Sequence, residues 1–432
     1  MNIINWSALS ESQKQQTLAR PKQLNNATLF ADVQAIIARV QKQGDKAVLA
    51  YTKKFDGVAL THIAVSEAEF EQAEKELPEA IKAALVQAKE RIMRWHKAGM
   101  SKAFSVKTAP GVHCGRIIRP IQRVGLYIPA GTAPLPSTVL MLGIPALLAG
   151  CPEVLMCTPV QANGQVNPAI LVAAKLCGIS RVYKVGGAQA IAAMAHGTST
   201  IGACAKIFGP GNSYVSTAKQ LVQCLPGGPA IDLPAGPSEV LVIADLKSNA
   251  EFVAADLLAQ AEHGPDSQVI CISSSTLKLK QIIRAVAKQS ALLPRQAIVM
   301  KALAHARFIK TQSIAQAIAV SNQYAPEHLI LSVNKASRYV DLVRAAGSVF
   351  IGEWASESLG DYCSGTNHTL PTNGYARAYS GVSVSSFQLN ISTQHVSKKG
   401  IQAIGPCAEI LARCEQLDAH ANSVSIRLKA LT

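Results

Sequence analysis

Apolar and polar positions change their spacing near Val124, and this change separates two kinds of pattern. Between residues 28 and 100, apolar positions recur at helical intervals among mixed charges, as in A-L-V-Q-A-K-E-R-I-M-R-W-H. Beyond Val124, short apolar runs alternate with helical stretches. The predicted strands are residues 153–158, 181–185, 205–208, 239–244, 267–273, 329–333 and 347–351. Near-continuous apolar strands between helices are typical of parallel sheets covered on both faces, so we predict an α/β fold.

The chain of 432 residues is long enough for two such units, each with its own core. We predict two Rossmann-like parallel-sheet domains, one inserted into the other. The predicted segments are a small N-terminal helical arm (1–25), a discontinuous first domain (26–124 plus 239–383), an inserted second domain (125–238) and a C-terminal tail (384–432). The tail has a sequence pattern typical of a helix near residues 400 to 420.

The composition is that of a globular protein, with 49% hydrophobic and 16% charged residues. The formal net charge of +15 raises nucleic acid or an anionic ligand as a partner. No run of Lys or Arg exceeds two residues, however, and aromatic residues make up only 5%, so no base-stacking surface is evident. We therefore interpret the charge as a surface property and expect no nucleic-acid partner.

Several features predict a cytoplasmic protein without a membrane partner. The longest apolar run, residues 139–151, is too short for a membrane span and contains a proline. The first residues lack the charged segment and apolar core of a signal peptide. The ten cysteines form no C-x-x-C pair, and several, such as Cys157 and Cys271, lie in apolar surroundings. This pattern is typical of reduced, buried cysteines in a cytosolic enzyme.

One candidate site lies near the end of a predicted helix. Ser248 and Glu251 fit the S-x-x-E capping box, which predicts a helix start, and a later Gly-Pro pair predicts its end. Gln260 and His263 are three residues apart and therefore lie on one face of that helix. They could bind a metal, although glutamine is an unusual zinc ligand. A histidine in the last turn is also explained by its favourable interaction with the helix dipole.

A second polar stretch, residues 357–377, follows the predicted strand at 347–351. It contains Asp361, Asn367 and His368 together with many turn-forming residues. In open α/β sheets, ligands bind beyond the carboxyl ends of the strands, so we expect these side chains at that edge. A long hydrogen-bonded surface loop would have the same composition.

Other polar features are compatible with structural as well as functional roles. Glu415 and His420 lie in the tail, where a solvated helix face accounts for them. Residues 184–193 and 207–214 each place a glycine turn between a strand and a helix. Backbone N–H groups at such helix starts favour an anion, but neither turn contains the full G-x-G-x-x-G fingerprint.

The stretch N-Q-Y-A-P-E-H-L-I-L-S (322–332) places two ionisable residues, Glu327 and His328, at the start of a buried strand. Neighbouring residues in an extended strand point to opposite faces. Because this pair follows Pro326 at the exit of a turn, both side chains could instead face one cleft.

Together these stretches resemble one family, the histidinol dehydrogenases. The matching motifs include V-G-L-Y-I-P-A-G, V-G-G-A-Q-A-I-A-A, I-F-G-P-G-N, D-L-L-A-Q-A-E-H-G-P-D-S-Q, N-Q-Y-A-P-E-H-L and G-D-Y-C-S-G-T-N-H-T-L-P-T, in family order from about residue 20 to the end. The resemblance implies the last steps of histidine biosynthesis, in which L-histidinol is oxidised through L-histidinaldehyde to L-histidine with two NAD+. It also implies one zinc ion per subunit and an intertwined homodimer whose tail contributes to the partner's active site.

The resemblance also implies a role for each candidate side chain. His328 would be the base for the hydride-transfer steps, and Glu327 would activate water. The implied zinc ligands are Gln260, His263, Asp361 and His420. The implied substrate contacts are Ser238, Gln260, His263, His328, Asp361, His368, Glu415 and His420, and the implied NAD contacts are Tyr127, Gln189 and Asn212.

Two other classes of function, a zinc hydrolase and a basic binding protein, are compatible with parts of this sequence. In a zinc hydrolase, Glu327 would activate water, and the glycine turns near residues 186 and 211 would be structural. A basic binding protein that has lost catalysis would bind nucleic acid in a salt-dependent manner, but the intact Glu327–His328 pair argues against it. Cys363 stands where the resemblance leads us to expect a small residue. We interpret it as a buried spectator, although a thiolate beside Asp361 could also bind zinc.

Overall fold

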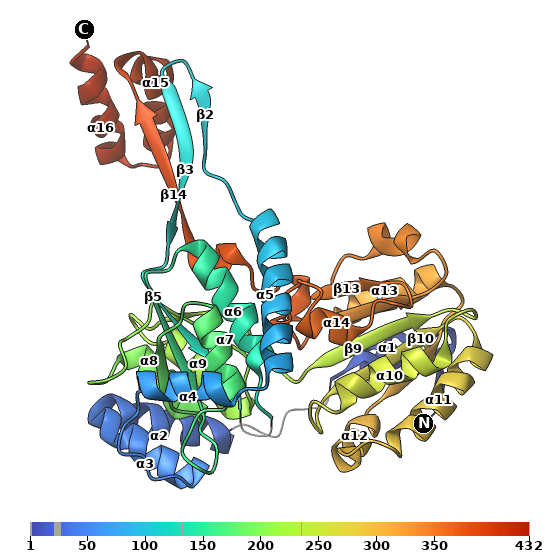
Figure 1. The fold of residues 1–432 in the computed structure, drawn as a ribbon. Helices are drawn as coiled ribbons and strands as arrows, with labels where there is room; N and C mark the ends of the chain where they lie inside the picture. The colour runs from blue at the N-terminus through green and yellow to red at the C-terminus, as the bar shows by residue number, and fades with distance from the viewer. Residues whose placement is uncertain (1, 21–26, 131–132, 235, 432) are drawn as a thin grey trace.

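The computed structural model describes residues 2–20, 27–130, 133–234 and 236–431. In this part of the chain the strands form two parallel sheets and one antiparallel sheet. Figure 1 shows the two parallel sheets in separate bodies side by side, with the antiparallel sheet in an arm that projects from one of them. The predicted α/β fold with two parallel-sheet units is confirmed. Each of the seven predicted strands is present, with ends that differ by one residue at most.

The six-stranded sheet is parallel throughout, in the order β1 (Ile3–Asn5), β11 (Arg307–Lys310), β10 (Gln268–Ser273), β9 (Glu239–Ala244), β12 (His328–Ser332), β13 (Ser348–Ile351). The chain forms β9, then β10 and β11 on one side of it, and then β12 and β13 on the other. The strand order therefore reverses between β9 and β12. Every residue of β9, β10 and β12 is buried, as expected for strands covered on both faces.

Helices cover both faces of this sheet. One face packs on α10 (Ala250–Ala261), α11 (Thr276–Ser290) and α12 (Gln296–Leu303), and the other on α13 (Ile314–Tyr324). Helix α1 (Glu11–Leu18) adds Leu18 to the second face, and α14 (Glu357–Tyr362) contacts α10. The predicted capping box of α10 is wrong. The N-cap is Asn249, whose side chain accepts the N–H of Glu251 at 2.9 Å, because the Ser248 hydroxyl instead donates to the carbonyl of Ser332.

The five-stranded sheet is also parallel, in the order β6 (Arg181–Lys184), β5 (Glu153–Thr158), β4 (Arg123–Tyr127), β7 (Lys206–Phe208), β8 (Ala230–Ile231). Its order reverses between β4 and β7. Helices α6 (Pro136–Ala149) and α7 (Pro168–Leu176) pack on one face, and α8 (Gly187–His196) and α9 (Ser213–Gln223) on the other.

An outer layer of helices covers this second unit. It consists of α2 (Ala27–Gln43), α3 (Asp45–Asp56), α4 (Glu67–Glu76) and α5 (Glu79–Ala98), which confirms the helical text predicted for residues 28–100. Helix α2 packs on α8 and α9, α4 on α7, and α5 on α6. The structure thus places these helices on the five-stranded sheet, whereas the predicted first domain joined them to residues 239–383. The predicted boundary at residues 25 and 26 lies outside the described residues, and the domain division stays a prediction.

The projecting arm consists of an antiparallel sheet, in the order β14 (Gln388–Val396), β3 (Val112–Pro120), β2 (Phe104–Ala109), with α15 (Lys398–Cys414) and α16 (Asp418–Lys429). The C-terminus lies at the end of this arm (Figure 1). At its base, Phe387 stacks on Phe208 with ring centroids 3.9 Å apart, a contact that contributes about 1 kcal/mol beyond its buried area. Helices α15 and α16 confirm the helical pattern predicted in the tail.

The short 3-10 helices are η1 (Trp6–Ala8), η2 (Ala336–Leu342), η3 (Tyr375–Arg377) and η4 (Val384–Phe387). Among the described residues, we find no helix with the length and apolar character needed to cross a bilayer.

Candidate functional site

The candidate side chains gather at the amino edge of the six-stranded sheet. His328 is the first residue of β12, and its Nε2 lies 3.6 Å from Oδ1 of Asp361. Asp361 lies on α14, which follows β13 and runs back toward the starts of the strands. The expectation that residues 357–377 lie beyond the carboxyl ends is therefore wrong. Helix α14 reverses direction after β13 and carries Asp361 to the opposite edge.

Glu327 and His328 are both buried, at 5% and 4% exposure, and their side chains lie together rather than on opposite faces. Oε2 of Glu327 is 3.7 Å from Nδ1 of His328. The turn that precedes them contains Ala325 in the left-handed region (φ 54°), so the chain enters β12 out of a sharp turn. The two side chains therefore lie together, and that they face a common cleft stays a prediction.

The backbone of Glu239, the first residue of β9, holds both side chains. Its N–H donates to Oε2 of Glu327 at 2.8 Å, and its carbonyl lies 3.1 Å from Nδ1 of His328. A carbonyl can only accept a hydrogen bond, so Nδ1 of His328 carries the proton. If the ring is neutral, Nε2 is the unprotonated nitrogen; it lies 3.6 Å from Oδ1 of Asp361 and has no hydrogen-bond partner among the described residues. In that neutral form, Nε2 could take a proton from a bound molecule.

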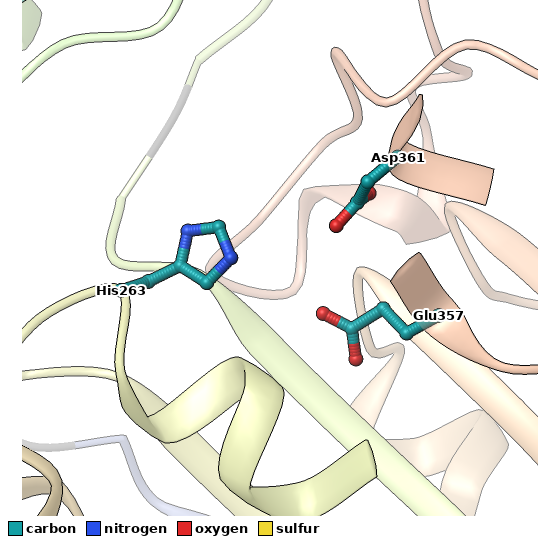
Figure 2. Close-up of side chains that lie close together, drawn as sticks. All are labelled: His263, Glu357 and Asp361. Carbon is teal, nitrogen blue, oxygen red and sulfur yellow. The ribbon is translucent and has the colours of Figure 1, made fainter. Parts of the chain in front are cut away.

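Three donor side chains form a group that could hold a metal ion. One ligand atom from each of His263, Glu357 and Asp361 lies within 4.8 Å of the other two. Figure 2 shows the His263 ring facing the two carboxylates. One helical turn before His263, Gln260 is fully buried, and neither its amide oxygen nor its nitrogen has a partner in the described part of the chain. An imidazole, two carboxylates and an orphaned amide fit a zinc ion.

Glu357 was not predicted from the sequence. Its side chain is 1% exposed, and both of its oxygens lack a hydrogen-bond partner among the described residues. The available signal was its spacing: it precedes Asp361 by four residues, which places both carboxylates on one face of a helical turn. The unpaired, buried state of Glu357 is visible only in the fold.

The charges at this edge favour a bound cation. Burial alone would lower the pKa of His328, but the surrounding carboxylates, Glu357 foremost, outweigh it and raise the pKa well above its usual value. Burial raises the pKa of Glu327 to about 8 and that of Glu357 well above its ordinary range. Burial would also raise the pKa of Asp361, but neighbouring imidazoles, His328 first, lower it instead. A divalent cation bound here would offset the charge of these carboxylates and would so favour the neutral form of His328.

His368 also reaches this edge. Its Nδ1 lies 2.8 Å from the carbonyl of Asp361, and its Nε2 lies 3.2 Å from the hydroxyl of Thr138 on α6. Burial lowers its pKa. Thr138 was not anticipated, because a buried threonine inside an apolar helix gives no signal in the sequence. Ser238 immediately precedes Glu239, and its carbonyl accepts the N–H of Gln268 at 3.0 Å.

The neighbouring Asn367 is fixed by His96 on α5. Its amide nitrogen donates to the carbonyl of Met141 at 2.6 Å and lies 3.2 Å from Nε2 of His96, which must therefore be an unprotonated acceptor. Burial lowers the pKa of His96 to about 4. His96 can therefore accept this hydrogen bond, and so hold the loop that carries His368, only while the His96 ring is neutral.

This buried histidine predicts an acid-sensitive stability. As pH falls from about 6.5 toward 4, the unfolded chain binds a proton at residue 96 that the folded chain does not bind, so stability is present above this window and is lost within it. The expected loss is about 3 kcal/mol. Urea unfolding between pH 7 and 4 should show a shallower pH dependence for His96→Gln than for the wild type. The exposed His305, changed to Gln, serves as the control, and equal slopes for all three proteins would contradict the assignment.

Glu415 and His420 do not join this cluster within one chain. Both are exposed and lie near the two arm helices, Glu415 directly after α15 and His420 on α16. Figure 1 shows that these helices are remote from the six-stranded sheet. If the two side chains complete a site, they complete that of another subunit.

The three candidate NAD contacts lie in the five-stranded unit, at the carboxyl edge near the strand-order reversal between β4 and β7. Tyr127 ends β4, and its hydroxyl accepts the N–H of Gly187 at 3.0 Å at the start of α8, which carries Gln189. Burial raises the pKa of Tyr127 to about 12, so the hydroxyl stays protonated. Asn212 caps α9 by accepting the N–H of Val215 at 3.1 Å. Dinucleotides bind at such crevices in open α/β sheets.

The ten cysteines are all free, and Cys157 and Cys271 are buried, as predicted. Cys363 is half-buried and packs against the core cluster around α6 and α7. It is not part of the His263–Glu357–Asp361 group.

Comparisons with known proteins agree along the whole chain. A profile of the family described as histidinol dehydrogenase matches residues 19–428. A histidinol dehydrogenase of Xanthomonas axonopodis pv. citri (strain 306) is 56% identical over 428 residues, 99% of each chain. One from Vibrio parahaemolyticus serotype O3:K6 is 48% identical over 100% of this chain and 99% of its own. The crystal structure of histidinol dehydrogenase from Elizabethkingia anophelis matches with a TM-score of 0.95 at 50% identity, covering 99% of this chain and 98% of that one.

Proposed function

The chain belongs to the histidinol dehydrogenase family, and from this we propose that it oxidises L-histidinol to L-histidine in two NAD-dependent steps through a bound L-histidinaldehyde. Enzymes of this family are NAD-dependent oxidoreductases that act on histidinol. The observation that carries the detailed proposal is the buried pair Glu327 and His328, held by one backbone unit beside the donor group at His263 and Asp361.

We assign the metal site to Gln260, His263 and Asp361, with His420 supplied by a second subunit. Glu357 lies in the same group and adds a carboxylate. A zinc ion bound there would orient the imidazole and amine of the substrate and would supply positive charge beside the reacting alcohol. The chain's own contribution is a set of donors on and just after α10 and on α14, of which Gln260 and Glu357 are buried.

The two bases have separate tasks in this proposal. Hydride can leave the alcohol carbon for NAD only as the O–H proton departs, and Nε2 of a neutral His328 would accept that proton. The aldehyde must then be hydrated before a second hydride can leave. Glu327, in its ionised form, takes the proton of the attacking water; burial raises its pKa to about 8, which makes the carboxylate a stronger base than an exposed one. His328 acts again on the hydrate.

The arm supports a dimer with shared active sites. Its antiparallel sheet exposes apolar side chains, among them Phe104, Val106 and Ile391, and its helices expose Ile410 and Leu411. Exposed apolar groups on a projecting element are typical of a surface that another chain covers. A partner's arm would carry Glu415 and His420 to the metal and substrate site.

The proposed NAD site depends on Gly209, which follows β7. Its φ of 122° suits only glycine, and a Cβ there would lie 2.1 Å from the carbonyl oxygen of Tyr127. Its N–H donates to Oδ2 of Asp232 at 2.8 Å, and its carbonyl accepts from Lys219 at 2.8 Å. A buried ion pair between Asp232 and Lys219 therefore fixes the turn that precedes Asn212.

Replacing Gly209 with alanine should raise KM for NAD at least about 10-fold. The new Cβ would clash with the backbone of Tyr127, so the backbone of the turn itself would have to move. Initial rates at varied NAD measure this KM. Gly150 is a matched control, because it also has a positive φ (80°) but open space around its Cβ position. The Gly150→Ala protein should lose some stability and keep its KM. An unchanged KM in Gly209→Ala would contradict the placement of NAD.

The proposed activity is tested by mixing L-histidinol, NAD and zinc-loaded protein and following NADH absorbance. NADH formation that requires both substrates supports the proposal. A protein that forms no NADH, even with zinc bound and as a dimer, would overturn it. Hydrolysis of an amide or ester substrate without NAD would point instead to the zinc hydrolase alternative.

A further inference from the structure

Glu239 lies between the two proposed bases and the N-terminal segment. Its backbone N–H holds Glu327, and its backbone carbonyl holds His328. The side chain of Glu239, only 1% exposed, points to a different set of groups: Arg20 and the N–H of Asn373, which donates to Oε1 at 2.9 Å. Any movement of this one residue would displace both bases together.

Arg20 makes the larger share of these contacts. Its Nε and Nη2 donate to the two oxygens of Glu239, the second at 2.8 Å, so the pair is bidentate. The guanidinium also stacks on the ring of Tyr324 at 3.9 Å from the centroid. Its side chain is 16% exposed, so both members of the ion pair are largely removed from water. A buried pair of this geometry is far more restrictive than a surface salt bridge.

The same guanidinium binds the turn that leads to Glu327. Nη2 of Arg20 donates to the carbonyl of Tyr324 at 3.0 Å and approaches that of Ala325 at 3.4 Å. Ala325 holds a left-handed conformation without being glycine, which requires support from its surroundings. Arg20 thus joins the start of β9 to the turn before β12.

We propose that Arg20 is a positioning residue that, through Glu239 and the turn at Ala325, fixes Glu327 and His328 relative to each other and to the substrate. The proposal rests on the proposed function, because it assigns the two bases as catalytic. Arg20 belongs to a segment more than 200 residues away in sequence from Glu239 and touches no reacting atom. It acts by holding the backbone unit from which both bases take their orientation.

The test compares Arg20→Met and Glu239→Gln with the wild type. Both changes remove the ion pair and leave the backbone N–H and carbonyl of residue 239 in place. A reacting group displaced by about 1 Å can cost about 100-fold in rate, so kcat for L-histidinol should fall about 10- to 100-fold. KM for NAD should stay within about 2-fold, because the NAD contacts lie on the other sheet. Zinc content per chain should also be unchanged.

Two further variants separate positioning from general destabilisation. The double variant Arg20→Met/Glu239→Gln should be no slower than the slower single variant, because the two residues act as one unit. Arg123 is a control for the loss of a bidentate pair away from the site: it pairs with Glu153, at 2.8 and 3.1 Å, at the amino end of β4, and both side chains are more exposed, at 37% and 33%. Arg123→Met should leave kcat unchanged, with at most a small change in melting temperature.

Wild-type kcat within experimental error in Arg20→Met would overturn the inference, as would a loss of kcat that only mirrors a loss of folded, zinc-loaded protein. Should Arg20→Met fail to fold, Arg20→Lys decides. An ammonium cannot form two parallel bonds to Glu239 and stack on Tyr324, so its kcat should lie below that of the wild type. A lysine variant as fast as the wild type would overturn the inference. A wild-type protein that does not oxidise L-histidinol would instead sink the proposed function itself.

Discussion

Replacing His263 with alanine should remove the zinc ion and the oxidation of L-histidinol together. His263 supplies the imidazole of the group that also contains Glu357 and Asp361. Loss of even an outer-shell partner typically weakens metal binding by 10- to 100-fold, so loss of a direct ligand should weaken it by about 100-fold or more. After dialysis against a weak chelator, zinc per chain is measured by atomic spectroscopy, and NADH formation is measured on the same sample.

The exposed His305 provides the control for this experiment, because it lies in the same unit but outside the donor group. His305→Ala should keep both zinc and activity. A His263→Ala protein that is free of zinc and fully active would disprove the ligand assignment. A variant that keeps its zinc but loses activity would mean that His263 contacts the substrate instead.

Replacing Glu327 with glutamine should slow the second oxidation far more than the first. Glutamine retains an oxygen that can accept the N–H of Glu239, so the geometry at the start of β9 is preserved while the base is lost. Removal of a general base typically costs about 100- to 10,000-fold in the step that it serves. In single-turnover experiments, one equivalent of NADH should form at a rate close to that of the wild type, and the second should form slowly.

His328→Gln is the natural comparison, because the proposal has His328 act in both hydride transfers. It should slow the formation of both equivalents. If Glu327→Gln slowed both half-reactions equally, the separate roles of the two bases would be wrong. Aldehyde supplied directly to each variant distinguishes the second step from the first.

The sequence predicts the two parallel sheets well, because a strand buried on both faces is a continuous apolar run. The arm strands β2, β3 and β14 were not predicted. Most residues of β2 and β14 are exposed, so these strands carry no apolar pattern, and their pairing joins residues 104–120 to residues 388–396. Four strands of the parallel sheets, β1, β4, β8 and β11, were missed as well. The helical pattern of residues 28–100 predicts helices α2 to α5, but it contains no information about which of the two sheets these helices pack on.

The candidate site, like the fold, was predicted from the sequence only in part. Gln260, His263, Asp361 and the Glu327–His328 pair were identified by resemblance, since their types and order match a family. The edge of the sheet at which they meet was predicted wrongly, because the return direction of α14 depends on tertiary packing. Glu357, Arg20 and Thr138 were missed, since their roles arise from burial and from partners distant in sequence.

The proposed ligand His420 lies far from the other three proposed ligands of the same chain. Three of the four implied ligands lie at the amino edge of the six-stranded sheet, while His420 lies on α16 in the arm. At the base of the arm, Phe387 stacks on Phe208 of the five-stranded unit, and the arm extends away from the six-stranded sheet (Figure 1). This separation is the reason to propose that each arm serves the other subunit.

The most direct test of the account is the number of NADH molecules formed for each L-histidinol consumed, with the product identified at complete conversion. Two bases set beside one metal site predict two NADH for each L-histidinol, L-histidine as the product and no free aldehyde. One NADH with aldehyde released into solution, or consumption of L-histidinol without NADH, would contradict it.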